Sequence, residues 1–129
     1  MQVAGNQAQL GELVRQLIEA EPAVFAAAVL SGNNVVIYQT SNWDVTAEAY
    51  KLAAVQSGQE GAVELQGVRY AIVERVPERI VGTNVAGQGH VILCPAGTGW
   101  LLVYVNPQVG PRDALFSVQE FAAKMAPYV

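Results

Sequence analysis

The chain has a single cysteine, Cys94, and a single histidine, His90, among its 129 residues. A lone cysteine excludes a disulfide within the chain, which is typical of a reducing compartment. A zinc site needs three or four ligands, and these two residues cannot supply them. We therefore expect no metal ion and no cofactor. We interpret His90 as a turn residue and Cys94 as a small core residue.

Basic residues and long apolar runs are also scarce. Seven Lys and Arg against eleven Asp and Glu give a net charge of −4 and a pI of about 4.8. The basic residues are scattered, which argues against binding to nucleic acid or to an anionic membrane surface. No apolar run reaches the ~20 residues of a membrane-spanning helix, and no secretory signal pattern is visible. We expect a cytoplasmic protein without membrane insertion.

The sequence lacks motifs for catalysis and phosphate binding. The segment 84–90, NVAGQGH, has two glycines, but Ile92 occupies the place of the third glycine of a dinucleotide-binding loop. A strand is expected after it, so no helix N-terminus would face a phosphate. We interpret the glycine pair as a bulge or wide turn. No G-x-S-x-G motif is present and the acidic residues are dispersed, so we predict that the protein is not an enzyme.

Apolar residues make up 52% of the chain, and their spacing predicts three helices. In the first, apolar positions recur at i, i+3, i+4 and i+7, and in the other two the apolar residues also lie along one side. The first helix is expected over residues 5–22, where Pro22 ends it. The second is expected over 41–58 and ends at Gly58. The third covers 111–126. Its apolar stripe comprises Ala114, Leu115, Val118, Phe121, Ala122 and Met125.

Continuous or alternating apolar segments predict the strands. These lie at 23–30 and 35–39, within 62–85 with a turn at Pro77 and Glu78, and at 90–94 and 100–105. The segments 79–85 and 90–94 form either two strands or one long strand bent at glycines. The order α-ββ-α-βββ-α predicts a single α+β domain over residues 1–129. Its antiparallel sheet would have five or six strands, with helices on its faces.

Three stretches resemble a known family. FAAAVLSGNNVVIYQT (25–40), LQGVRYAIVERVPERIVGTNVAGQGHVI (65–92) and WLLVYVNP (100–107) resemble the first hairpin, the middle strands and the last strand of the roadblock/LC7 family. The similarity covers a core of about residues 10–107. The helix at 111–126 would be an extension that some members have.

This resemblance implies a dimer of the chain with itself or with a paralogous roadblock chain. In the family, third strands pair across a two-fold axis and second helices pack side by side, which agrees with the liability of an unpaired edge strand. Carried onto this chain, the interface would comprise Ala49, Leu52, Ala53, Gln56, Val63, Leu65, Val68 and Tyr70.

The resemblance also implies a non-catalytic scaffold or regulator that binds a Ras-like small GTPase, or a light chain in a signalling or motor complex. Arg69, Arg75 and Arg79 are interpreted as surface residues of strands and not as an arginine finger. Trp43 would either pack against its helix or form an exposed anchor for a partner, and Trp100 would be a core residue. The alternative is a small-molecule sensor of PAS or GAF type, which would need an internal pocket with converging polar groups.

Overall fold

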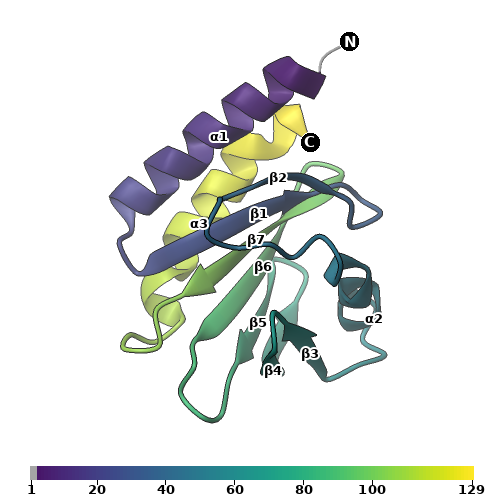
Figure 1. Cartoon of the computed structure of the whole chain (residues 1–129), viewed down its shortest axis with the longest axis vertical. Helices are drawn as coiled ribbons and strands as arrows, with labels where there is room; N and C mark the ends of the chain where they lie inside the picture. Colours follow the sequence, from purple (N-terminus) through teal and green to yellow (C-terminus); the bar gives the residue numbers. More distant parts are fainter. Residues whose placement is uncertain (1–2) are drawn as a thin grey trace.

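The computed structural model describes residues 3–129, which form three α-helices and seven β-strands (Figure 1). Their bounds in chain order are α1 (Val3–Ala20), β1 (Val24–Leu30), β2 (Val36–Gln39), α2 (Leu52–Gln56), β3 (Ala62–Leu65), β4 (Val68–Val76), β5 (Arg79–Thr83), β6 (His90–Ala96), β7 (Gly99–Val105) and α3 (Arg112–Met125). Single turns of 3₁₀ helix precede α2 at Ala49–Lys51 and follow α3 at Ala126–Tyr128.

All seven strands form one antiparallel sheet in the order β2-β1-β7-β6-β5-β4-β3. Strands that follow one another in the chain are neighbours in the sheet, except β2 and β3, which lie at its two edges. Strand β1 instead lies beside β7, where Leu30 is paired with Trp100. The predicted α+β class is confirmed. The predicted number of five or six strands is wrong.

A two-residue turn explains the extra strand. Gln66 and Gly67 have φ angles of 51° and 79°, and both therefore adopt the left-handed conformation of a tight hairpin turn. This turn divides the expected strand at 62–76 into β3 and β4, with Leu65 opposite Val68. Gln66 hid the turn, because a non-glycine residue seldom adopts a positive φ.

The segment NVAGQGH is a wide turn between β5 and β6. Asn84 organises it: its side-chain Oδ1 accepts the N–H groups of Ala86 and Gln88 at 2.9 and 3.0 Å. Its Nδ2 donates to the carbonyl oxygen of Arg69 at 2.8 Å, which ties the turn to β4. The side chain is 8% exposed. Gly87 and Gly89 have φ angles of 84° and 116°, so the glycines serve the backbone conformation, as the sequence indicated.

The two faces of the sheet carry different helices. In Figure 1, α1 and α3 lie side by side across one face, and the short α2 lies on the other side beside β3. The apolar stripe of α3 is buried as predicted, and it belongs to the same core as α1 and the central strands. Its members are Ala114, Leu115, Val118, Phe121, Ala122 and Met125. Within residues 3–129, no helix is long and apolar enough to cross a membrane.

The second predicted helix is mostly wrong. Only Leu52–Gln56 is α-helical, although Gly58, with a φ of 84°, ends the segment as expected. Side chains compete with helix formation before it. The Asp44 carboxylate accepts the N–H of Thr46 at 3.0 Å, and Gln39 Oε1 accepts the N–H of Val45 at 3.1 Å. These bonds hold the segment before the 3₁₀ turn in irregular turns.

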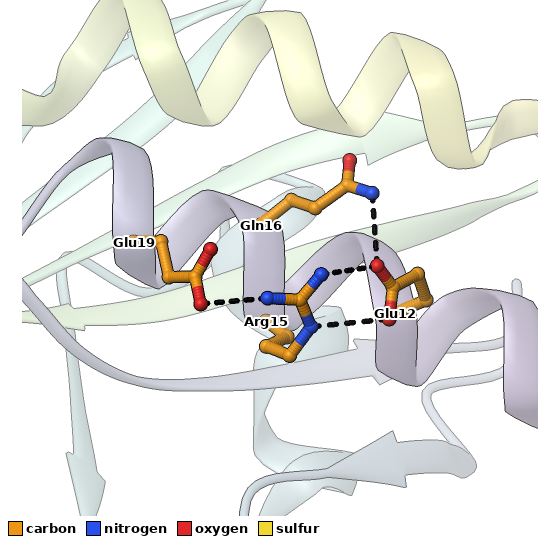
Figure 2. Close-up of polar contacts among 4 residues, drawn as sticks. All are labelled: Glu12, Arg15, Gln16 and Glu19. Atoms are coloured by element: carbon orange, nitrogen blue, oxygen red, sulfur yellow. Dashed lines mark hydrogen bonds and ion pairs between the residues drawn. The ribbon is translucent and has the colours of Figure 1, made fainter.

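Arginine and glutamate side chains form a small network on the outer face of α1. Figure 2 shows Arg15 between Glu12 and Glu19, one turn away in each direction. Arg15 Nε lies 3.1 Å from Glu12 Oε1, Arg15 Nη1 lies 2.6 Å from Glu19 Oε2, and Gln16 donates to Glu12 at 3.0 Å. Hydrogen bonding to Arg15, and then to Gln16, lowers the pKa of Glu12 to about 2.

The network predicts a displaced titration of Glu12. A folded-state pKa below that of an unfolded glutamate, ~4.3, means that the contribution to stability is present above that value. It is lost as the pH falls through the lower pKa of the folded protein. Arg15→Ala should move the Glu12 midpoint, followed by NMR of the side-chain carboxyl carbon, back toward the ordinary value. Arg112→Ala, which removes a distant guanidinium, should leave it unchanged; equal midpoints in both variants would contradict the network.

Candidate functional site

The sheet face that carries α1 and α3 is only partly covered. The two helices contact each other, and on the sheet α3 contacts β6 and β7 while α1 contacts β1 and β2. β4 and β5 continue the sheet beyond α3. Val81 of β5 faces the α1–α3 core, so Arg79, two residues earlier, projects to the same face. Glu74 is paired with Val81 and shares that face. Helix α3 therefore lies beside strands that carry the partly buried polar side chains of Glu74 and Arg79.

One side of α3 faces these strands. Arg112, Phe116, Gln119 and Ala123 are spaced at i, i+4, i+7 and i+11, so they share a side of the helix. Gln119 fixes its direction, because its Oε1 accepts a hydrogen bond from Arg79 Nη1 at 3.1 Å. We call this region the α3–β5 surface. It comprises Glu74, Arg79, Arg112, Phe116, Gln119 and Ala123.

A polar network holds the α3–β5 surface together. Arg79 donates two hydrogen bonds to Glu74, from Nε at 3.0 Å and from Nη2 at 3.1 Å. Arg112 Nη2 lies 3.8 Å from the same carboxylate. Hydrogen bonding to Arg79 lowers the pKa of Glu74, which keeps the carboxylate charged near neutral pH. The bidentate Arg79–Glu74 pair orders the surface before any partner arrives.

Large apolar side chains are exposed at this network. Phe116 is 84% exposed on α3, and Val73, next to Glu74 on β4, is 63% exposed. A scattered valine on a surface is ordinary, but an almost fully exposed phenylalanine beside an ordered ion-pair network is typical of a protein-binding anchor. The α3–β5 surface is therefore the best candidate for a protein interface on this face.

A shallow depression continues the surface toward the β4–β5 turn. It has a volume of about 280 Å³ and is lined by Pro77, Glu78, Cys94, Pro95, Gln119 and Ala123. Burial raises the pKa of the Cys94 thiol to about 12, so the thiol stays protonated and unreactive. The depression adds shape to the α3–β5 surface and no reactive group.

A second cavity, of about 290 Å³, lies on the opposite side of the sheet near the turn 84–89. Trp43 is 7% exposed there, and its ring centroid lies 6.2 Å from that of Tyr104. Trp43 thus packs inward and is not an exposed anchor. Burial, and then the nearby Tyr104, raise the pKa of Tyr70 to about 12, so the phenol is neutral. Trp100, expected in the core, is half-buried against the hydrophobic core that contains Trp43 and Tyr70.

Both ring nitrogens of the histidine lie within hydrogen-bonding distance of neighbouring groups. His90 is the first residue of β6, where Nδ1 lies 3.1 Å from Thr83 Oγ1 and Nε2 lies 2.9 Å from the carbonyl oxygen of Val109. It thus links β5, β6 and the loop before α3, which corrects its interpretation as a turn residue. Across residues 3–129, no three His, Cys, Asp or Glu side chains gather closely enough to hold a metal ion.

The residues predicted for a dimer interface lie mostly inside the chain. Ala49, Leu52, Val63, Leu65 and Tyr70 are 5% exposed or less, because α2 and the preceding 3₁₀ turn pack against the sheet. These buried side chains offer no surface to a second chain.

The remaining members of that predicted set are also engaged within the chain, except Ala53. The side-chain amides of Gln56 and Asn34 exchange hydrogen bonds at 2.9 and 3.1 Å. Val68 packs against the hydrophobic core on the α2 side of the sheet. Ala53 is exposed.

Sequence reasoning missed the members of the α3–β5 surface. Phe116 falls outside the apolar stripe of α3, and an aromatic residue on the polar side of a helix is the signal that could have identified it. Arg79 was interpreted only as a surface residue. Arg75 also has a structural role, because it donates to the carbonyl oxygen of Val55 at 3.0 Å and to that of Glu60 at 2.8 Å.

Comparison with known proteins gives close relatives, although no family model matches the chain. Loki profilin-1 of Lokiarchaeum sp. (strain GC14_75) is 39% identical over 123 residues, which cover 88% of this chain and 92% of the relative. Loki profilin-2 of the same organism is 39% identical over 124 residues, with the same coverage.

Solved structures agree. LokiProfilin1 in a crystal structure with rabbit actin is 36% identical and matches with a TM-score of 0.88, over 95% of this chain and 97% of that chain. LokiProfilin2, also in a complex with rabbit actin, is 34% identical with a TM-score of 0.87, over 94% of this chain and 98% of that chain. A roadblock/LC7 domain from Streptomyces avermitilis has a TM-score of 0.60 at 21% identity, which shows only a shared fold.

These similarities overturn the functional expectations. A dimeric scaffold for a Ras-like small GTPase or for a motor complex is wrong, because the close relatives are profilins and two of them form complexes with actin. The alternative of a PAS or GAF sensor is wrong for the same reason. With relatives 39% identical over nearly their whole length, the chain belongs to the profilin family, and its resemblance to roadblock/LC7 proteins is a likeness of fold.

Proposed function

We propose that this protein binds an actin monomer through the α3–β5 surface. The observation that carries the proposal is that LokiProfilin1 and LokiProfilin2, which are 36% and 34% identical to this chain, form complexes with rabbit actin. The expectation that the chain is not an enzyme is confirmed by its membership of the profilin family. We therefore propose that the protein acts by covering a surface of actin.

The α3–β5 surface has the features of a protein interface. Phe116 provides an apolar anchor, and the Arg79–Glu74 pair beside it is already ordered by two hydrogen bonds. Arg112, with a side chain that is 75% exposed, places a positive charge at the rim. An anchor with a polar rim and a prearranged network gives affinity at a low entropic cost.

We propose that the chain acts as one domain and in the cytoplasm. The helix at 112–125, first expected to be an extension, contributes to the same core as α1 and the central strands, which supports a single unit over the described residues. The buried free thiol of Cys94 is compatible with a reducing compartment.

Calorimetric titration of monomeric rabbit actin with this protein tests the proposal. We expect a one-to-one complex with a dissociation constant in the micromolar range, about −8 kcal/mol of binding free energy. The same protein should slow the spontaneous assembly of pyrene-labelled actin, because a bound monomer has one surface covered. No heat and no co-elution at about 100 μM protein would show that the proposed function is wrong.

A further inference from the structure

Within residues 3–129, β3 is the last strand of the sheet and pairs only with β4, so no strand pairs with its outer edge. The N–H of Ile72 donates to the carbonyl oxygen of Gly61 at 2.8 Å, which establishes the hydrogen-bonding alternation along the pair. Val63 therefore directs its backbone groups toward β4. Ala62 and Glu64 direct theirs away from the sheet, which leaves two N–H and two C=O groups available.

A groove runs along this edge. Its volume is about 740 Å³, and one wall is α2 with the preceding 3₁₀ turn, while the other is β3. Small side chains keep the groove open beside the free backbone groups, and Tyr50, which is 70% exposed, stands at its border. The lining residues are Tyr50, Lys51, Ala53, Ala54, Ser57, Gln59, Glu60, Ala62, Val63 and Glu64.

The next backbone N–H group beyond this edge already has a hydrogen-bond acceptor within the protein. The backbone N–H of Gln66, two residues beyond Glu64, donates to the Glu48 carboxylate at 2.6 Å. An acceptor on the segment that forms the groove wall thus already occupies the end of the edge. Ala62 and Glu64 have no such acceptor among the described residues, and an extended backbone in the groove would supply it.

The negative charge of the groove favours a basic occupant. Glu60 and Glu64 both line the groove, whereas the only basic lining residue, Lys51, has its Nζ 3.9 Å from Glu48 Oε2. A second copy of this chain would bring the same carboxylates to the edge, and like charges across paired strands are destabilising. A peptide with basic side chains would instead be attracted.

We propose that the β3 edge binds an extended basic peptide of another protein by strand addition. The peptide backbone pairs with Ala62 and Glu64. Its alternate side chains lie either against the alanines of α2 or near Glu60 and Glu64. This site lies beside α2, on elements other than those of the α3–β5 surface, so its occupancy and actin binding are separate measurements.

Amide hydrogen exchange measured by NMR tests the proposal. The probe is a blocked heptapeptide in which valine and lysine alternate, and the comparison peptide alternates valine and glutamate. The basic peptide should slow exchange at the amides of Ala62 and Glu64 at least tenfold, while the amide of Val63, already bonded to β4, changes little. Unchanged exchange at millimolar peptide, or equal protection by the acidic peptide, would overturn the proposal.

Variants separate edge pairing from nonspecific attraction. Glu60→Lys with Glu64→Lys should weaken binding of the basic peptide at least tenfold. The matched control, Glu19→Lys with Glu120→Lys, makes the same change of net charge at exposed sites elsewhere and should retain binding. Ala62→Pro removes one edge donor at the first strand position, where proline is tolerated, and should weaken binding about fivefold. Equal affinities in the two charge variants would contradict the site.

The oligomeric state tests the competing occupant. Light scattering after size exclusion should give a monomer whose Ala62 and Glu64 amides exchange rapidly without peptide. A dimer in which these two amides are already protected would mean that a second copy occupies the edge, and the proposed peptide site would be wrong.

Discussion

Phe116→Ala should weaken binding to rabbit actin at least ~30-fold, which corresponds to about 2 kcal/mol, the threshold of an interface hot spot. Phe116 is 84% exposed in the free protein, so its removal leaves no cavity in the core. The midpoint of thermal unfolding should therefore change by no more than a degree or two. Binding is measured by calorimetry and stability by circular dichroism.

The matched control is Tyr50→Ala. Tyr50 is another aromatic residue with most of its surface exposed, 70%, but it lies beside α2 and not on the α3–β5 surface. Its substitution should leave the affinity for actin unchanged within twofold. If both variants bound actin as the natural protein does, actin would have to dock elsewhere, and the α3–β5 surface would not be the interface.

Gly99→Ala should destabilise the fold by about 3 kcal/mol or more, within the range of severe single substitutions. Gly99 begins β7, and a Cβ atom there would lie 2.0 Å from the carbonyl oxygen of Leu30 in β1 and 2.6 Å from a methyl group of Val129. The Val129 side chain can move, but the Leu30 carbonyl belongs to the strand paired with β7. Strands β1 and β7 must therefore separate locally.

Thermal unfolding gives the measurement, with an expected fall of about 10 °C or more in the midpoint. Gly61→Ala is the control, because a Cβ atom at Gly61 meets no heavy atom within 4 Å and Gly61 has no positive φ. It should cost a small fraction of the Gly99 effect. Similar losses in both variants would mean that general glycine replacement, and not contact with the Leu30 carbonyl, is responsible.

Helical periodicity proved informative where packing alone decides the structure. In α3, each predicted stripe residue from Ala114 to Met125 is buried, because a two-sided helix has one way to face a sheet. The helix prediction for the segment before α2 was wrong for a local reason. Its side chains, such as Asp44, bond nearby backbone N–H groups and compete with the helix, and apolar spacing carries no information about this competition.

The candidate site could not be predicted in the same way. The hydrogen bond between Arg79 and Gln119 joins residues 40 positions apart, and only the fold brings β5 beside α3. The family was misjudged for a related reason. Element order is shared by folds that differ in function, and a roadblock/LC7 domain superposes on this chain at 21% identity. The comparison with profilins, at 39% identity, distinguishes them.

The pairing of β1 with β7 affects how the chain is made on the ribosome. Leu30 in β1 pairs with Trp100 in β7, so this edge of β1 stays uncovered until residue 100 has been synthesised. The pairing of β1 with β7 can therefore form only after most of the chain has been made. Until then, β2 is the only one of the two sheet neighbours of β1 that has been synthesised, and the β1 segment VFAAAVL is apolar and uncharged. An apolar, uncharged strand with an uncovered edge is prone to aggregation, so β1 is exposed to this risk until β7 has been synthesised.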